Sequence, residues 1–237
     1  MAECRHEQLY LIGIREQPIR PGLRRIRFQT SRGQFEAVAH TGAEADRGVV
    51  MLSGFRGDFE GPGLVYPELA SRLADEGLMA LRLSYRIPGD CVQCGLDTLL
   101  ALQYLYDEGI EDVVVVGWSF GAAVAVAVGS VAKTVRGVAA VSYVHTPGCC
   151  TSYLRTKPIL VVHGANDRIS PCESSRRLYA KAGPHRRLII YPDVGHDLTP
   201  SRNRLLVDLE AWTIGILHAA SLDREGIVPQ KIQAGAP

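Results

Sequence analysis

Short runs of β-branched residues alternate with helix-length amphipathic segments along most of the chain. Around Ser31-Arg32-Gly33, polar and apolar residues alternate on both sides of a tight turn, which predicts a β-hairpin over 24–30 and 34–40. The apolar period then switches repeatedly between strand and helix. We expect strands at 48–53, 78–84, 112–117, 137–144, 158–163 and 188–191, and helices at 67–75, 96–106, 122–131, 171–182 and 199–219.

A hairpin followed by repeated strand–helix units predicts the α/β fold class, with a mostly parallel sheet and helices on both faces. Right-handed crossovers place the carboxyl ends of the parallel strands along one edge, where ligand sites form. We expect one domain over 24–220, an N-terminal extension over 1–23 and a C-terminal tail over 221–237. Gln8–Ile14 is a candidate for an extra edge strand, and Ser170-Pro171-Cys172-Glu173 predicts a capping box.

An uncharged stretch, Val113–Ala132, is about as long as a membrane span and contains Gly117-x-x-x-Gly121. Its two halves favour different structures. Val113–Val116 is a pure β-branched run that favours a strand, whereas the Ala/Val run from Ala122 favours a helix. We therefore predict a buried strand, a sharp turn and a buried helix, with a membrane span as the alternative.

Composition and charge exclude some partners. The chain has 237 residues, 46% of them hydrophobic and 22% charged, and a formal net charge of +1. This balance provides no long-range attraction to nucleic acid or anionic lipid, so we expect neither as a partner.

Six cysteines are present, and the polar start Met-Ala-Glu-Cys-Arg-His-Glu lacks the apolar core of a secretory signal. The expectation is therefore a cytoplasmic protein with reduced thiols. Cys91-Val92-Gln93-Cys94 is a CxxC pair and Cys149-Cys150 is a vicinal pair. A structural zinc site needs four ligands, so one CxxC is weak evidence for metal. We predict incidental thiols, with a metal or redox role as the alternative.

The strongest chemical signal is Gly117-Trp118-Ser119-Phe120-Gly121, which fits G-x-S-x-G. A β-branched strand precedes it and a small-residue helix follows it, as a nucleophile elbow requires. The tight turn would lift the Ser119 hydroxyl clear of the sheet, and glycines would let the strand and helix backbones approach closely. The alternative is a structural Gly-Ser turn.

A serine hydroxyl needs a general base, and histidine is the usual one. Of seven histidines, His196 lies directly after the last predicted strand, in a loop that returns to the edge where Ser119 projects. His145 and His163 also follow or end strands on that edge, and they remain alternative bases.

The base needs a carboxylate that fixes its tautomer. Asp167 follows the strand 158–163 in the loop Gly164-Ala165-Asn166-Asp167-Arg168. Asp193 and Asp197 are nearer to His196 in sequence, but neighbours in one short loop are poorly placed to reach the far ring nitrogen. We therefore expect Ser119, Asp167 and His196 to form a catalytic triad, in the chain order of α/β-hydrolases.

These motifs, together with Val-Val-His-Gly-Ala-Asn-Asp at 161–167 and Val-Gly-His at 194–196, resemble the α/β-hydrolase superfamily over about residues 24–220. Within it, the chain is most similar to cap-free, dienelactone-hydrolase-like enzymes. The resemblance implies acyl-enzyme chemistry on a small ester-type substrate, with no metal and no cofactor. It also implies an oxyanion hole formed by the backbone N–H groups of Phe55 and Phe120, and two such donors would hold a tetrahedral oxyanion.

Two features differ from that family. Dienelactone hydrolases use a cysteine nucleophile where this chain has Ser119, and the His-Gly-Gly-Gly form of the oxyanion loop is absent. About 40 residues separate the elbow helix from Asp167, which leaves no room for a large lid and predicts an open site. Candidate pocket-lining residues are Tyr85, Trp118, Tyr143 and His145.

The predicted function is hydrolysis of carboxylic ester or thioester bonds. A serine peptidase or amidase acting on short peptides is the nearest alternative, because it would use the same triad. A catalytically silent binding scaffold is an alternative from a different class, and a broken triad would be its sequence signature.

Overall fold

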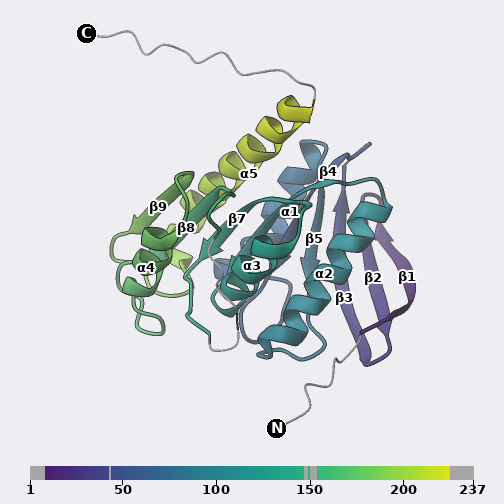
Figure 1. Cartoon of the computed structure of the whole chain (residues 1–237), viewed down its shortest axis with the longest axis horizontal. Helices are drawn as coiled ribbons and strands as arrows, with labels where there is room; N and C mark the ends of the chain where they lie inside the picture. Colours follow the sequence, from purple (N-terminus) through teal and green to yellow (C-terminus); the bar gives the residue numbers. More distant parts are fainter. Residues whose placement is uncertain (1–8, 43, 147–148, 150–153, 225–237) are drawn as a thin grey trace.

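A computed structural model of the chain describes residues 9–42, 44–146, 149 and 154–224 (Figure 1). Its strands are β1 (Leu11–Arg20), β2 (Leu23–Thr30), β3 (Gly33–Thr41), β4 (Arg47–Leu52), β5 (Met79–Leu83), β6 (Asp112–Trp118), β7 (Val135–Val141), β8 (Ile159–Gly164) and β9 (Arg186–Tyr191). Its α-helices are α1 (Tyr66–Asp75), α2 (Cys91–Asp107), α3 (Phe120–Val131), α4 (Glu173–Lys181) and α5 (Arg202–Arg224). Two short 3₁₀ helices are η1 (Pro62–Leu64) and η2 (Thr199–Ser201).

All the strands form one sheet in the order β1-β2-β3-β5-β4-β6-β7-β8-β9. The pairs from β1 to β5 are antiparallel, and those from β5 through β4 to β9 are parallel. The parallel part therefore has its carboxyl ends along one edge, as predicted. Within the described residues, no large cap domain is inserted above that edge.

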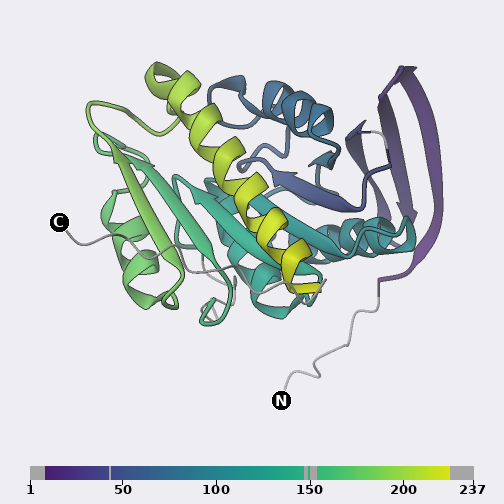
Figure 2. The same ribbon diagram turned by 90° about the horizontal axis from the view of Figure 1, so that it is seen from above.

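Helices cover both faces of the sheet, with α2, α3 and α4 on one side and α1 and α5 on the other (Figure 2). The β6 residues show why the strands are apolar throughout. Val113 and Val115 pack into the core under α2 and α3, whereas Val114 and Val116 pack toward α1 and α5. A parallel strand buried on both faces has no solvent side, so its sequence is a continuous apolar run.

The membrane alternative for Val113–Ala132 is wrong, because this stretch folds into β6, a turn and the buried helix α3. Within the described residues, the one helical stretch long and apolar enough to cross a membrane is Thr199–Leu222. Leu205, Leu209 and Leu217 of that stretch are buried in the core against the sheet.

Several predicted boundaries differ from the structure. The edge strand β1 reaches Arg20, beyond the predicted end at Ile14, and pairs along β2. Helix α2 begins at Cys91 because Asp90 caps it, accepting hydrogen bonds from the N–H groups of Val92 and Gln93. The predicted capping box at 170–173 is wrong, since the Ser170 hydroxyl donates to the Tyr143 carbonyl and α4 has no side-chain cap.

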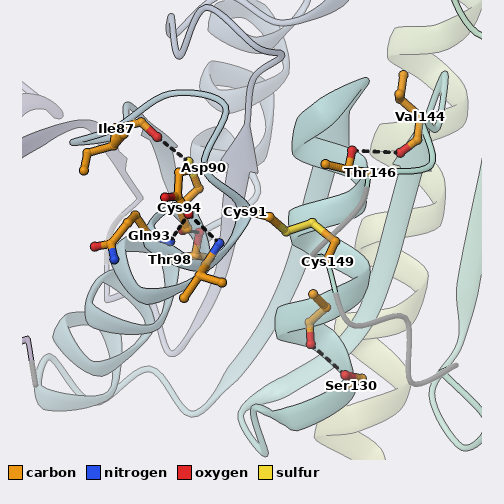
Figure 3. Close-up of a disulfide and its surroundings, with 12 residues drawn as sticks. Ile87, Asp90, Cys91, Gln93, Cys94, Thr98, Ser130, Val144, Thr146 and Cys149 are labelled. Atoms are coloured by element: carbon orange, nitrogen blue, oxygen red, sulfur yellow. Dashed lines mark hydrogen bonds between the residues drawn. A yellow bond between two sulfur atoms is a disulfide. The ribbon is translucent and has the colours of Figure 1, made fainter. Parts of the chain in front are cut away.

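A disulfide joins Cys91, at the start of α2, to Cys149, in the segment after β7 (Figure 3). The prediction of incidental reduced thiols is therefore wrong for this pair. Cys94, the other member of the CxxC, is a buried free thiol that donates to the Ile87 carbonyl. Persistent disulfides are typical of oxidising compartments. The prediction of a cytoplasmic location assumed reduced thiols, and this disulfide removes that argument for it. Cys150 lies outside the described residues.

Candidate active site

Ser119 occupies the turn between β6 and α3, with φ 57° and ψ −119°. This is the left-handed region, which costs a non-glycine residue about 1–3 kcal/mol and is found mainly where function requires it. The Ser119 N–H donates to the Val141 carbonyl at the end of β7, and its carbonyl accepts from the Ala122 N–H. The strained turn is thus held from both the sheet and the helix.

The glycines of the motif allow three backbone segments to meet. A Cβ on Gly117 would lie 2.2 Å from the Gly121 carbonyl oxygen, and a Cβ on Gly121 would lie 2.3 Å from that of Ser53. Neither position can carry a side chain without moving the backbone. Strand β6, helix α3 and the loop after β4 therefore pack directly on one another at this point.

The imidazole of His196 lies between Ser119 and Asp167. Its Nε2 is 2.9 Å from the Ser119 Oγ, and its Nδ1 is 2.7 Å from the Asp167 Oδ2. The three residues are far apart in sequence, and they meet because each follows a parallel strand at the same sheet edge. Asp193 and Asp197 do not take the place of Asp167. The Asp197 carboxylate instead accepts from the Thr199 N–H.

The Asp167 carboxylate is buried and well hydrogen-bonded. Its Oδ1 accepts from the N–H groups of Ile169 and Ser170, at 2.8 and 2.9 Å. Burial by itself raises the pKa of Asp167, but the hydrogen bonds from Ser170, His196 and Ile169 outweigh it, so that the pKa lies below its usual value. At neutral pH Asp167 is therefore an anion, and it can accept a hydrogen bond from the N–H at Nδ1 of His196.

The loop that carries His196 is fixed by its neighbours. The His196 carbonyl accepts from the Trp118 indole at 3.2 Å and from the Ser142 hydroxyl at 3.0 Å. Gly164, at the end of β8, packs so tightly that a Cβ there would lie 2.3 Å from the Val194 carbonyl oxygen. The last residues of β6 and β8, together with the residue after β7, thus all hold the His196 loop.

The two residues predicted to form the oxyanion hole, Phe55 and Phe120, lie close to Ser119. Phe120 is the first residue of α3, where backbone N–H groups lack helical partners. Phe55 follows Gly54, and the backbone at Gly54 lies beside Ser119. A Cβ built on Gly54 would lie 3.6 Å from the Ser119 Cβ. The rings of Phe55 and Phe120 meet edge to face with centroids 6.0 Å apart. The Phe55 side chain is otherwise exposed to solvent.

The four candidate lining residues have different environments. Trp118 is half-buried and contacts the His196 loop through its indole. Tyr85 and Tyr143 are buried, and the Tyr85 hydroxyl donates to the Ser53 carbonyl in the loop after β4. His145 is exposed. Through these contacts, Trp118 supports the His196 loop and Tyr85 supports the loop after β4.

Two residues near the site were not assigned these positions from the sequence. Ser142, with φ 47°, donates to the His196 carbonyl and anchors the His196 loop. His163, considered only as an alternative base, instead lies buried against Asp167, with its Nε2 3.0 Å from Oδ2. A histidine four residues before the acid, at the end of a buried strand, is the signal in the sequence that points to this contact. Within the described part of the chain, no group of three His, Cys, Asp or Glu residues could hold a metal ion.

Solved structures share this fold at low sequence identity. Est1E from Butyrivibrio proteoclasticus has a TM-score of 0.67 at 14% identity, covering 78% of this chain and 95% of that one. A serine hydrolase without a lid from Xanthomonas campestris has a TM-score of 0.68 at 15% identity, covering 83% and 98%. An esterase from Pyrococcus furiosus has a TM-score of 0.66 at 18% identity, covering 81% and 93%. These likenesses show an α/β-hydrolase fold.

The sequence itself matches the dienelactone hydrolase family over residues 82–212. That range is more than half of the chain, and it begins in β5 and ends in α5. It contains the Ser119 turn, the Asp167 loop and the His196 loop. The chain therefore belongs to the dienelactone hydrolase family and is an α/β-hydrolase enzyme.

Proposed function

We propose that this hydrolase is a serine esterase in which Ser119 is the nucleophile, His196 the general base and Asp167 the acid that orients the base. The observation that carries the proposal is one imidazole within hydrogen-bond distance of both partners, 2.9 Å from the Ser119 Oγ and 2.7 Å from the Asp167 Oδ2. Nucleophile, base and orienting group in this arrangement are what serine acyl-transfer chemistry needs.

In the first half-reaction, the Ser119 Oγ attacks the ester carbonyl carbon while His196 Nε2 takes the hydroxyl proton. The Asp167 anion stabilises the resulting imidazolium and keeps the Nδ1 proton in place. The carbonyl oxygen becomes an oxyanion, which the N–H groups of Phe55 and Phe120 would bind. The intermediate then collapses, the alcohol leaves with the proton from His196, and Ser119 remains acylated.

In the second half-reaction, water gives a proton to His196 and attacks the acyl carbon. Collapse of the second intermediate releases the carboxylic acid and returns the proton to Ser119. The chain's own residues supply every proton transfer in this sequence.

The substrate would be a small or protruding ester. Residues between β7 and β8 are too few for a large lid, and the solved relative from Xanthomonas campestris is described as lacking one. Another similar structure is Est1E with ferulic acid bound, a carboxylic acid of the kind that ester hydrolysis releases. Both points favour esters over large folded substrates.

Labelling with a serine-directed phosphonate tests the nucleophile. Wild type should be labelled at Ser119, and Ser119→Ala should not be labelled. Ser130→Ala is a matched control, because Ser130 lies on the same helix and donates to the Ala127 carbonyl. An unlabelled wild type, or equal labelling of Ser119→Ala, would refute the proposal and favour a binding scaffold.

A panel of chromogenic esters, thioesters and short peptide amides of graded chain length tests the bond type. Ester turnover should exceed amide turnover. His196→Ala should lose about as much activity as Ser119→Ala, at least about 10³-fold, because triad members act as a unit. Faster amide cleavage would make the enzyme a peptidase, and retained turnover in His196→Ala would assign the base to another histidine.

A further inference from the structure

A second imidazole contacts the same carboxylate oxygen as the proposed base. His163, near the end of β8, is buried, and its Nε2 lies 3.0 Å from the Asp167 Oδ2. His196 Nδ1 approaches that oxygen at 2.7 Å. Because Oδ1 already accepts two backbone N–H groups, the Asp167 carboxylate has two partners on each oxygen. The carboxylate is therefore fixed from four directions, one of which is the proposed base.

The neighbours of His163 determine which ring nitrogen carries its proton. Nε2 faces two acceptors, the Asp167 carboxylate and the Ser170 carbonyl at 2.9 Å, so it must be the N–H donor. Nδ1 lies 2.6 Å from the Ser175 Oγ on α4, and it accepts the hydroxyl proton. The tautomer follows from the hydrogen-bond network. Burial lowers the pKa of His163 and keeps the ring neutral.

We propose that His163 is a positioning residue for the reaction, holding the Asp167 Oδ2 toward His196 and sharing its negative charge through a neutral N–H donor. This inference rests on the proposed function. Sharing the oxygen limits how strongly the carboxylate attracts a proton on His196. It also stops the carboxylate from rotating away while His196 passes through its protonated form. The buried Ser175 hydroxyl donates to Nδ1 and so satisfies the nitrogen that carries no proton in this tautomer.

Loss of the His163 donor should therefore change the reaction in two ways. The less stabilised carboxylate should attract the His196 imidazolium more strongly, which moves the acid limb of the kcat/KM profile to higher pH. The freer carboxylate should lower kcat, with little effect on KM, because His163 is fully buried and has no surface that a substrate could contact. A charge-assisted hydrogen bond of this kind justifies an expected loss in kcat of about tenfold.

The test compares His163→Leu, which removes the donor, with His163→Gln, whose amide N–H can occupy the position of Nε2. Activity is measured per phosphonate-titrated site, so that a smaller folded fraction does not count as a catalytic loss. His163→Leu should show about tenfold lower kcat and an acid limb displaced upward by about half a pH unit or more. His163→Gln should recover most of both.

Ser175→Ala is the second variant, because it removes the hydrogen bond to Nδ1, which makes the Nε2–H a weaker donor, and it leaves the ring in place. It should displace the acid limb in the same direction by a smaller amount. If His163→Leu keeps the wild-type kcat and acid limb, the inference is wrong. If His163→Leu does not fold, an unchanged limb in Ser175→Ala refutes it instead. Wild type that is not labelled by phosphonate would refute the proposed function itself, so the two failures are distinct.

Discussion

At the scale of single residues, Gly121 shows how little freedom the backbone turn at Ser119 has. A Cβ at this position would lie 2.3 Å from the Ser53 carbonyl oxygen and 2.5 Å from that of Leu52. Both contacts are with backbone, so relief requires the loop after β4 to move away from α3. We expect Gly121→Ala to lower the free energy of unfolding by about 2–3 kcal/mol and to reduce kcat, because Phe55 lies on that loop. Urea denaturation and ester hydrolysis measure the two effects.

Gly215→Ala is the matched control for this prediction. Gly215 is exposed within α5, and nothing lies within 4 Å of its would-be Cβ. Alanine in an exposed helix should raise the free energy of unfolding by about 1 kcal/mol and leave kcat unchanged. If the two variants changed the free energy of unfolding by the same amount, the close approach of backbone atoms at Gly121 would have no measurable effect on stability.

The residues of the candidate site were predictable to different degrees. Ser119 stands in a local motif, and Asp167 and His196 each follow a strand whose carboxyl end had to lie on the same edge. The spacing of four residues between His163 and Asp167 points to their contact, but the hydrogen bonds of Ser170 and Ser175 to the His163 ring were not predictable, because they depend on how the loop after β8 turns back. Such side-chain contacts depend on loop geometry, which the hydrophobic periodicity of the sequence does not predict.

At the scale of elements, the Cys91–Cys149 disulfide ties the start of α2 to the segment after β7. The cysteines are 58 residues apart in sequence, so the bond constrains a long loop in the unfolded chain. A loop of this length corresponds to about 4 kcal/mol of stabilisation from chain entropy. We expect the double variant Cys91→Ala/Cys149→Ala to have a Tm lower by about 8–15 °C.

A reducing agent separates the loss of the bond from the loss of the two side chains. It should lower the Tm of wild type and leave that of the double variant unchanged. Non-reducing alkylation of the denatured wild type should leave Cys91 and Cys149 unmodified. A wild-type Tm that does not respond to the reducing agent would contradict the prediction.

The pairing of these cysteines shows where sequence patterns stop being informative about elements. Both follow strands on the sheet edge that carries the candidate site, but the strand order places β4 and β6 between β5 and β7. Only the observed path of α2 and of the segment after β7 brings the two Cα atoms to 5.5 Å. The edge strand β1 was equally hard to assign, because its residues are all exposed and lack an amphipathic period.

At the scale of the whole molecule, the layered architecture was predictable and the strand order was not. Apolar runs such as Val113–Val116 predict strands buried on both faces, which in turn predict helices on both sides. The order β5-β4-β6 depends on which neighbour each crossover reaches, and several orders satisfy the same pattern. The polar cluster around His40 was also not predicted, although it links two layers of the fold.

That cluster makes the stability of the whole fold depend on pH. His40 of β3 is buried, and it accepts from Arg82 Nε of β5 and pairs with the Ser71 hydroxyl of α1. Burial, followed by the charges of Arg82 and Arg20, lowers its pKa to about 4. The Glu60 carboxylate lies 3.6 Å from the Arg82 guanidinium, and Arg82 also donates to the Phe59 carbonyl. Protonated His40 would therefore place a second buried cation beside Arg82.

The unfolded chain binds this proton first, because a free imidazole has a pKa near 6.5. As the pH falls from about 6.5 to about 4, the unfolded state is progressively stabilised and the free energy of unfolding falls by about 3 kcal/mol. Below the folded pKa, this group adds no further loss. Buried His163, whose pKa is also lowered, acts in the same direction. Urea denaturation at about pH 7.5 and pH 4.5 measures the fall.

His40→Gln isolates the contribution of His40, since glutamine can still accept from Arg82 but does not titrate. The fall in unfolding free energy between about pH 7.5 and pH 4.5 should be smaller in this variant by about 2.5 kcal/mol. A fall equal to that of wild type would show that His40 is not the group responsible. The acid sensitivity would then have to come from His163 or from carboxylates with lowered pKa, such as Asp167.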